Sequence, residues 1–268
     1  MEMTIALAQM AVALGRPQQN QLAAQSLAAR AVAQGARLLL LPELWTTGYD
    51  LERIHEYACP LDSGHFAMMA ELAQAHQLYV AGTALEANPH GRPFNTAALY
   101  GPDGNRVGAY RKIHLWPPLG EPEKMAAGDA LPAFDLPLGR VAMAICYDLR
   151  FPELWRCLAD AGAQLILIPA EWPVRRLEHW RLLLRARAVE NQLFVAGCNR
   201  AGADADGEFG GHSAVVDPWA RVLIEGRSEP GLFVTTIEMD EVARARQLFP
   251  FLADRRPEVY ARQQGGMQ

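Results

Sequence analysis

Three reactive side chains occupy the same kind of place in the sequence, because each follows directly on an apolar, strand-like run. They are Glu43, Lys112 and Cys146. A thiol can act as a nucleophile, a carboxylate can transfer protons, and an ammonium group can stabilise a developing anion. Active sites of α/β proteins are built where loops converge at the carboxyl ends of strands, so these residues are the first candidates for catalysis.

Each of the three also has an ordinary structural interpretation when it is taken alone. Glu43 could be a carboxylate at the start of a helix, and Lys112 could belong to a solvated basic pair with Arg111. Cys146 could be a buried, inert thiol, which is the commonest state of a cysteine in the cytosol. The position of a single residue therefore does not decide between catalysis and structure.

The remaining cysteines have weaker claims to a chemical role. Cys157 is expected at a core-like position of a helix, Cys198 at the end of a buried strand, and Cys59 in a loop before a proline. The four cysteines show no paired CxxC spacing, and the seven histidines are scattered. The sequence therefore gives no support for a metal site.

Strand and helix patterns alternate along the chain, which indicates an α/β fold with helices covering the sheets. Hairpins are expected where turn formers separate two strands, at residues 95–110 and 213–224, so an all-parallel sheet is unlikely. No repeat and no shift in composition divides the chain. We therefore expect one domain over residues 1–268, with an irregular C-terminal tail from about residue 249.

Composition excludes several classes of protein. Of the 268 residues, 50% are hydrophobic and 21% are charged, which is typical of a globular protein with a sizeable core. The net charge of −5, with acidic and basic residues interspersed, argues against a nucleic-acid partner. No apolar run approaches the roughly 18 residues of a membrane span, and the start does not resemble a signal peptide. We therefore expect a cytoplasmic protein with reduced thiols and no membrane partner.

The sequence around the three candidates is more specific than the residues themselves. The segments are Leu-Pro-Glu-Leu at 41–44, Tyr-Arg-Lys-Ile-His-Leu at 110–115 and Ile-Cys-Tyr-Asp-Leu-Arg-Phe-Pro-Glu at 145–153. In this order they resemble the nitrilase superfamily of carbon–nitrogen hydrolases, and the resemblance extends from the first strand to about residue 240. It implies a four-layer α-β-β-α sandwich of the nitrilase type, and a homodimer or higher homo-oligomer.

The resemblance also implies a role for each residue of the Glu-Lys-Cys triad. Cys146 would be the nucleophile, Glu43 the general base, and Lys112 the cation beside the oxyanion together with the Tyr147 backbone N–H. Amide hydrolysis needs these groups because an unactivated amide is a poor electrophile, and a free thiol with a pKa near ~8.5 is mostly protonated at neutral pH.

A second glutamate of the family pattern matches Glu121, which precedes Gly128 by seven residues (128 − 121 = 7). Its implied role is to position the lysine or the substrate amine, although a purely structural hydrogen bond is an equal alternative. The aromatic residue and the proline that are usual in this segment are replaced by Met125 and Ala127. This departure bears on the packing of the loop rather than on the carboxylate.

The substrate is indicated less directly. Residues 170–180 and 185–192 resemble the ω-amidase branch, which hydrolyses the distal amide of 2-oxo acids such as 2-oxoglutaramate. Arg176 lies in the first of these segments and could hold a substrate carboxylate in a bidentate manner. Alternatively, Arg175 and Arg176 could simply occupy the first turn of the next helix.

Aromatic residues near the candidate site could form the walls of a pocket. Trp172, Tyr49 and Trp116 are the candidates, although each could equally belong to the core. The expected partner is a small amide substrate, and no cofactor is implied. A broader aliphatic amidase and a nitrilase remain alternatives because both use the same triad, and a non-catalytic binding partner with this fold is a third.

Overall fold

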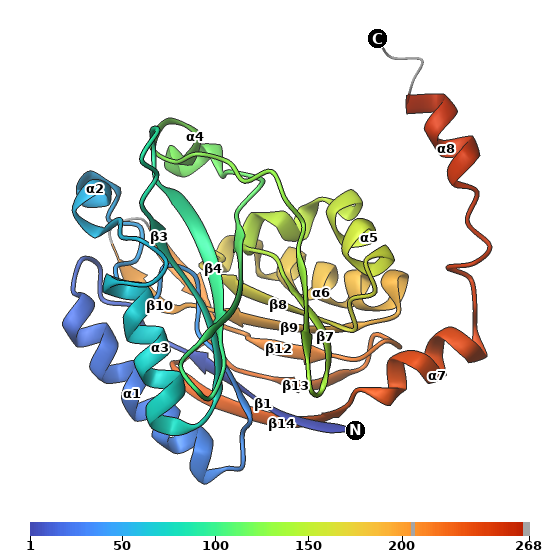
Figure 1. The fold of residues 1–268 in the computed structure, drawn as a ribbon, viewed down its shortest axis with the longest axis horizontal. Coiled ribbons are helices and arrows are strands. Elements are labelled where there is room, and N and C mark those ends of the chain that lie inside the picture. The colour runs from blue at the N-terminus through green and yellow to red at the C-terminus, as the bar shows by residue number, and fades with distance from the viewer. Residues whose placement is uncertain (205–206, 265–268) are drawn as a thin grey trace.

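Two six-stranded sheets lie face to face, and helices cover their outer faces (Figure 1). The computed structural model describes residues 1–204 and 207–264. The first sheet has the order β14 (Gly231–Glu238), β1 (Glu2–Gln9), β2 (Leu38–Leu40), β3 (Tyr79–Glu86), β4 (Phe94–Tyr100) and β5 (Arg106–Arg111). The second has the order β13 (Val222–Glu225), β12 (Ala214–Val216), β9 (Phe194–Asn199), β8 (Leu165–Ala170), β7 (Gly139–Met143) and β6 (Ala133–Leu136).

Both sheets are mixed, as the hairpin signals predict. In the first sheet β1, β2 and β3 run parallel, and β4, β5 and β14 are added in antiparallel fashion. In the second sheet β7, β8 and β9 run parallel, with β6, β12 and β13 antiparallel. A small ribbon is formed by β10 (Ala201–Asp204) and β11 (Gly207–Gly210). The predicted α/β sandwich is therefore the observed architecture.

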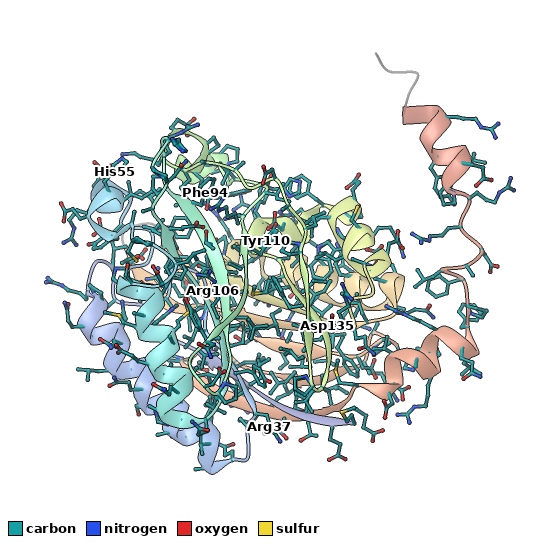
Figure 2. All side chains as sticks on the ribbon, in the orientation of Figure 1. Arg37, His55, Phe94, Arg106, Tyr110 and Asp135 are labelled. Atoms are coloured by element: carbon teal, nitrogen blue, oxygen red, sulfur yellow. The ribbon has the colours of Figure 1, made fainter. Side chains whose placement is uncertain are left out.

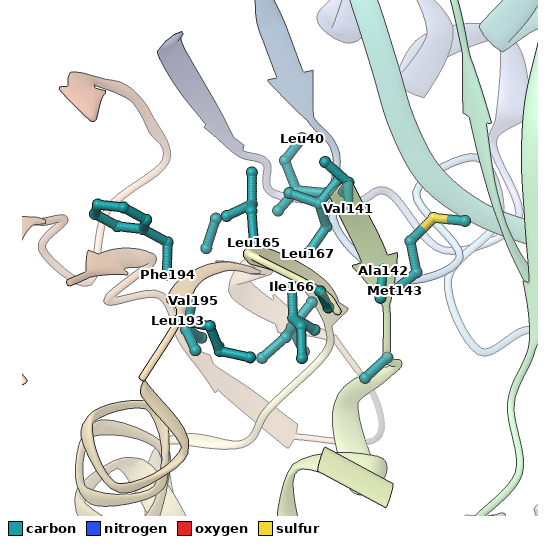
Figure 3. Packing of buried hydrophobic residues seen from close by; sticks show 14 of the residues in the cluster. Leu40, Val141, Ala142, Met143, Leu165, Ile166, Leu167, Leu193, Phe194 and Val195 are labelled. Atoms are coloured by element: carbon teal, nitrogen blue, oxygen red, sulfur yellow. The ribbon is translucent and has the colours of Figure 1, made fainter. Parts of the chain in front are cut away.

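Strand β2 explains why the sheets need covering on both sides. Alternate side chains of a strand point to opposite faces. Leu38 and Leu40 accordingly pack between the two sheets, whereas Leu39 and Leu41 pack against the helices outside the first sheet. Figure 3 shows Leu40 on the side of Val141, across the interface between the sheets. A strand that is apolar on both faces is stable only in such a layered fold.

Helices α1 (Pro17–Ala33) and α3 (Gly64–His76) cover the first sheet, and α5 (Pro152–Asp160) and α6 (Leu177–Asn191) cover the second. Helix α1 begins at a proline, which suits the first helical position because no hydrogen bond is lost there. Its buried face is made largely of alanines, which let the helix lie close to the sheet.

Shorter helical segments connect the strands or follow the last sheet strand. They are η1 (Leu51–Arg53), α2 (Ile54–Tyr57), η2 (Pro117–Leu119), α4 (Glu121–Lys124), η3 (Cys146–Arg150), η4 (Val174–Arg176), α7 (Asp240–Leu248) and α8 (Pro257–Gln264). Four of them, η2, α4, η3 and η4, lie in the loops that carry the candidate residues. In the described part of the chain, no helix is both long enough and apolar enough to cross a membrane.

Two local predictions were wrong. The tail after residue 249 is not irregular throughout, because α8 forms at Pro257, with Glu258 in its first turn, and both features favour a helix start. Helix α8 extends away from the two sheets, and the α8 side chains that Figure 2 draws stand clear of them. Cys157 is exposed rather than core-like, because the buried face of α5 runs through Leu154 and Leu158.

The inter-sheet core makes a direct prediction about stability. Leu40→Ala removes a fully buried side chain between the sheets and should lower the free energy of unfolding by about 2–5 kcal/mol. Leu22→Ala on α1 is the matched control, since Leu22 is 67% exposed and its loss should change stability by no more than about 0.5 kcal/mol. Urea unfolding followed by circular dichroism measures both values, and equal effects would contradict this packing.

Candidate active site

Segments from both sheets bring the candidate residues together at the carboxyl ends of strands. Glu43 follows β2, Lys112 directly follows β5, Cys146 begins η3 after β7, and Glu171 directly follows β8. The Glu171 backbone N–H donates to Glu43 Oε2 at 3.0 Å, which joins the second sheet to the first at this point. The rigid strands thus set the positions of the loops that carry the reactive groups.

The Glu43 carboxylate is fully buried, and several polar groups of the protein lie within hydrogen-bonding distance of it. Its Oε1 accepts from Lys112 Nζ at 2.8 Å, from the Tyr49 hydroxyl at 2.7 Å and from Asn95 Nδ2 at 2.9 Å. The next residue, Leu44, has a φ of 39°, a conformation that is unusual for a branched side chain. Thr83 Oγ1 accepts the Leu44 N–H at 2.6 Å and helps to hold this turn.

Lys112 is shared between two carboxylates. Besides Glu43, its Nζ contacts Glu121 Oε1 at 2.6 Å, and none of the three side chains is exposed to solvent. Burial lowers the pKa of Lys112, but the two carboxylates raise it by more, so the amine remains charged. Burial also raises the pKa of Glu121, against the opposing effect of Lys112. The cluster is therefore a buried cation between two buried carboxyl groups.

Glu121 is held in place by the loop that precedes it. Its Oε2 accepts the Trp116 backbone N–H at 2.6 Å, and its side chain lies at the start of the short helix α4. The replacement of the usual aromatic residue by Met125 does not open this loop, because Met125 is fully buried beside Leu44 and Tyr49.

Tyr49, predicted as a pocket wall, has a second role within this cluster. Its hydroxyl is 2.7 Å from Glu43 Oε1 and 2.5 Å from Glu121 Oε1, and it accepts a hydrogen bond from Lys112 Nζ at 3.2 Å. Burial raises the pKa of Tyr49 well above its usual value, and both carboxylates add to the rise. The hydroxyl therefore stays protonated, and its single proton is available to only one of the two carboxylates at a time.

Asp148 connects the turn at Cys146 to the end of β5 and the segment that follows it, which includes Lys112. Its buried carboxylate accepts the Ile145 N–H at 2.9 Å, the Tyr110 hydroxyl at 2.7 Å and the His114 N–H at 3.0 Å. These bonds support the backbone at Cys146, whose φ of 42° lies in the left-handed region. Figure 2 places Tyr110 in the interior of the molecule, where its ring packs in the inter-sheet core.

The electrostatics around Cys146 oppose ionisation of the thiol. Burial raises the pKa of Cys146 well above its usual value, Glu43 raises it further both by its charge and by a hydrogen bond, and Lys112 opposes this rise. At neutral pH the sulfur therefore carries its proton. A base in contact with the thiol is required if the sulfur is to attack a substrate.

Cys146 opens onto a pocket that has aromatic and charged residues in its lining. Six residues singled out from the sequence line it: Tyr49, Trp116, Cys146, Tyr147, Trp172 and Arg176. Arg176 lies in η4, just before α6, and its guanidinium stacks over the Trp116 ring at 5.0 Å. Its side chain is thus turned toward the pocket rather than only into solvent.

Sequence reasoning missed three residues of this site. Asn95 donates to Glu43, Glu171 lines the pocket and orients Glu43 through its backbone, and Arg150 lines the pocket beside Trp172. Glu171 follows a buried strand directly, so the same rule that selected Glu43 and Cys146 would have selected it. Asn95 is a polar residue within an otherwise largely apolar strand, which was the available signal for its burial.

Comparison with known families agrees with this architecture. A family model described as carbon-nitrogen hydrolase matches residues 4–247. The chain belongs to the carbon–nitrogen hydrolase family. The predicted superfamily and its sandwich fold are thereby confirmed.

Two curated relatives of this carbon–nitrogen hydrolase are similar over most of their length. It is 37% identical over 260 residues to the 2-oxoglutaramate amidase of Bacillus subtilis, covering 97% of this chain and 100% of that protein. It is 35% identical over 240 residues to the human omega-amidase NIT2, covering 86% of this chain and 87% of that protein.

Two solved structures are similar in fold. A superfamily member from Xanthomonas campestris, with an arsenic adduct in its active site, has a TM-score of 0.89 at 31% identity and covers 96% of this chain and 98% of that chain. A mutant amidase from Nesterenkonia sp. AN1 has a TM-score of 0.87 at 30% identity and covers 97% and 99%, respectively. In that mutant, acrylamide has added to the active-site cysteine.

The position of the Tyr49 hydroxyl predicts a change in the pH dependence of amide hydrolysis. Tyr49→Phe removes a hydrogen bond that lowers the pKa of Glu121, so this pKa should rise further and the acidic limb of the kcat/KM profile should move to higher pH. We expect kcat/KM to fall about 10- to 100-fold, as for loss of a hydrogen bond to a charged group. Tyr57→Phe is the control, because Tyr57 is also buried and donates to a carboxylate, that of Asp50, outside the site. A profile that moves equally in both variants would contradict this role.

Proposed function

We propose that this carbon–nitrogen hydrolase is an ω-amidase that hydrolyses the distal amide of 2-oxo dicarboxylic monoamides such as 2-oxoglutaramate. The observation that carries the proposal is that Arg176 lines the same pocket as Cys146, while its Nη1 is buried without a hydrogen-bond partner. An arginine placed in this way suits a substrate with a carboxylate at the end remote from the amide. The similarity to a 2-oxoglutaramate amidase and to an omega-amidase supports the same substrate class.

In the first half of the reaction, the Cys146 thiol attacks the amide carbon and its proton passes to Glu43. Glu43 Oε1 is already contacted by Lys112 Nζ, Asn95 Nδ2 and the Tyr49 hydroxyl, whereas Oε2 accepts one backbone N–H, so Oε2 has capacity for the proton. Lys112 and the Tyr147 backbone N–H stabilise the tetrahedral oxyanion. The C–N bond then breaks, the nitrogen takes the proton from Glu43, and ammonia leaves a thioester on Cys146.

In the second half, water attacks the thioester and Glu43 accepts its proton. The tetrahedral intermediate collapses by breaking the C–S bond, and the sulfur recovers the proton from Glu43. The net reaction is amide plus water to carboxylic acid plus ammonia. No cofactor is needed for this balance, and Glu121 positions Lys112 throughout by its contact at 2.6 Å.

Substitution of the nucleophile tests the mechanism. Cys146→Ala should abolish ammonia release, because no other described residue combines a thiol with contact to Glu43, while the circular dichroism spectrum and melting temperature should stay near those of the parent. Cys157→Ala is the control, since Cys157 is exposed on α5 and should retain full activity. Turnover by the Cys146→Ala variant would overturn the mechanism.

A substrate panel tests the proposed specificity. Ammonia release should be fastest with 2-oxoglutaramate or 2-oxosuccinamate, and slower with glutamine, asparagine, simple aliphatic amides and nitriles. Arg176→Met should raise KM for the dicarboxylic monoamides at least 10-fold more than for hexanamide, because only the former carry a carboxylate. Equal changes in KM for both classes would remove Arg176 as the carboxylate anchor, and a preference for nitriles would overturn the amidase assignment.

The cellular setting and assembly are also part of the proposal. The four cysteines are free, which suits a reducing compartment such as the cytoplasm. Helix α8 and the exposed Leu248 and Phe249 at the end of α7 offer apolar and helical surface that a second copy could cover, in keeping with a homodimer or higher homo-oligomer. One domain over the whole chain remains the expected organisation.

A further inference from the structure

Three arginines line the pocket beside the nucleophile, and one of them, Arg175, is exposed to solvent. Arg150 and Arg176 are the other two, and each guanidinium lies over an aromatic wall. The Arg150 guanidinium carbon is 4.6 Å from the centre of the Trp172 ring, and that of Arg176 is 5.0 Å from the centre of the Trp116 ring. Stacking on the rings limits the positions that the two planar cations adopt.

Neither arginine forms an ion pair with a carboxylate among residues 1–204 and 207–264. The hydrogen-bonding contact of the Arg150 guanidinium in these residues is with His179 Nδ1 at 3.4 Å, and Arg176 Nη1 is buried without a partner. Burial lowers the pKa of Arg150, and the charge of Arg176 lowers it further. The guanidinium groups of Arg150 and Arg176 are therefore close enough to repel each other electrostatically.

Arg200 shows how the same chain neutralises a buried arginine elsewhere. Its guanidinium contacts Glu171 at 2.8 Å and Asp204 at 2.6 Å, so the cation has two acidic neighbours. Two partly buried cations that form no ion pair within residues 1–204 and 207–264 are unfavourable, because each is partly desolvated and repelled by the other. The pocket end formed by Arg150 and Arg176 is therefore electrostatically incomplete until an anion binds.

Arg150 also has a fixed relation to the chemistry. It is the last residue of η3, the segment that begins with Cys146 and is held by the buried Asp148. One short turn therefore fixes the position of Arg150, and of an anion bound to it, relative to Cys146. Arg176 reaches the same pocket from η4, after the neighbouring strand β8.

We propose that Arg150 acts together with Arg176 to bind the carboxylate and adjacent 2-oxo oxygen of the substrate, and that the pair rejects amides carrying a 2-ammonium group. The inference rests on the proposed ω-amidase function and names the residue that sets its specificity. The carboxylate and the 2-oxo oxygen of such a substrate are hydrogen-bond acceptors and carry no donor, so they suit two guanidinium groups, which only donate. Glutamine has the same carboxylate and distal amide but places a third cation beside them, which is disfavoured.

Kinetics on four amides test this pairing: 2-oxoglutaramate, glutaric acid monoamide, L-glutamine and hexanamide. In Arg150→Gln, kcat/KM for 2-oxoglutaramate should fall at least 10-fold more than for hexanamide, mainly through KM, and the preference for 2-oxoglutaramate over glutamine should shrink at least 10-fold. Arg150→Lys should retain part of that preference because it keeps the charge. Arg185→Gln, an exposed arginine on α6 away from the pocket, is the control and should behave as the parent.

The same losses for all four amides would assign Arg150 a structural role and overturn the proposal. An unchanged preference over glutamine would overturn it as well. A wild-type protein without activity on 2-oxoglutaramate would instead count against the proposed function. The pairing is then judged by calorimetric titration of Cys146→Ala with 2-oxoglutarate and with L-glutamate.

In that titration the dicarboxylates act as product-like probes and no turnover is needed. We expect 2-oxoglutarate to bind more tightly than L-glutamate, and Arg150→Gln in the Cys146→Ala background to raise the Kd for 2-oxoglutarate at least 10-fold. Equal affinities for the two probes, or a Kd that does not change in Arg150→Gln, would contradict the pairing even if the enzyme is an amidase.

Discussion

The ammonium group of Lys112, buried between the carboxylates of Glu43 and Glu121, is the interaction on which the rest of the site depends. A charge without solvent is tolerated only when partners and hydrogen bonds compensate for its lost hydration. Here the partners come from the loops after β2 and β5 and from the start of α4, so the cluster holds three separate segments in one geometry. Tyr49 and Asn95 add further hydrogen bonds to the carboxylates. Removing one member would leave an uncompensated buried charge, so these groups are positioned as a unit.

The nucleophile is positioned by a second device that is linked to the first. Cys146 has a left-handed backbone conformation, and Asp148 fixes the turn by accepting bonds from Ile145 and from the segment on either side of Lys112. The thiol therefore lies beside the carboxylate of Glu43. Because the pKa of Cys146 is raised, the thiol keeps its proton at rest. A protonated thiol at rest is compatible with the proposed mechanism, in which the proton passes to Glu43 when the sulfur attacks.

Local pattern was informative wherever one physical rule dominated. Strands that are apolar on both faces, such as β2 and β8, predicted sheets covered on both sides, and turn formers predicted the β4–β5 and β12–β13 hairpins. Pattern failed where the deciding contacts are weak or few. Cys157 lies on a short helix, and the packing of Leu154 and Leu158 determines which face of that helix is buried. Helix α8 forms in a tail whose apolar residues show no helical periodicity from which it could be predicted.

The sequence by itself determined the residue types, their order and the strand ends that carry them, because period and turn chemistry are local properties. The strand ends singled out Glu43, Lys112 and Cys146 as candidates, and the resemblance of the surrounding segments to the nitrilase superfamily added Glu121. Only the tertiary structure decided which loop side chains turn inward: Tyr49 joins two carboxylates, and Arg150 and Arg176 line the same pocket. These contacts join residues that are distant along the chain, and a local sequence pattern carries no information about how close such residues lie in space. The substrate-binding end of the pocket is therefore a property of the folded molecule.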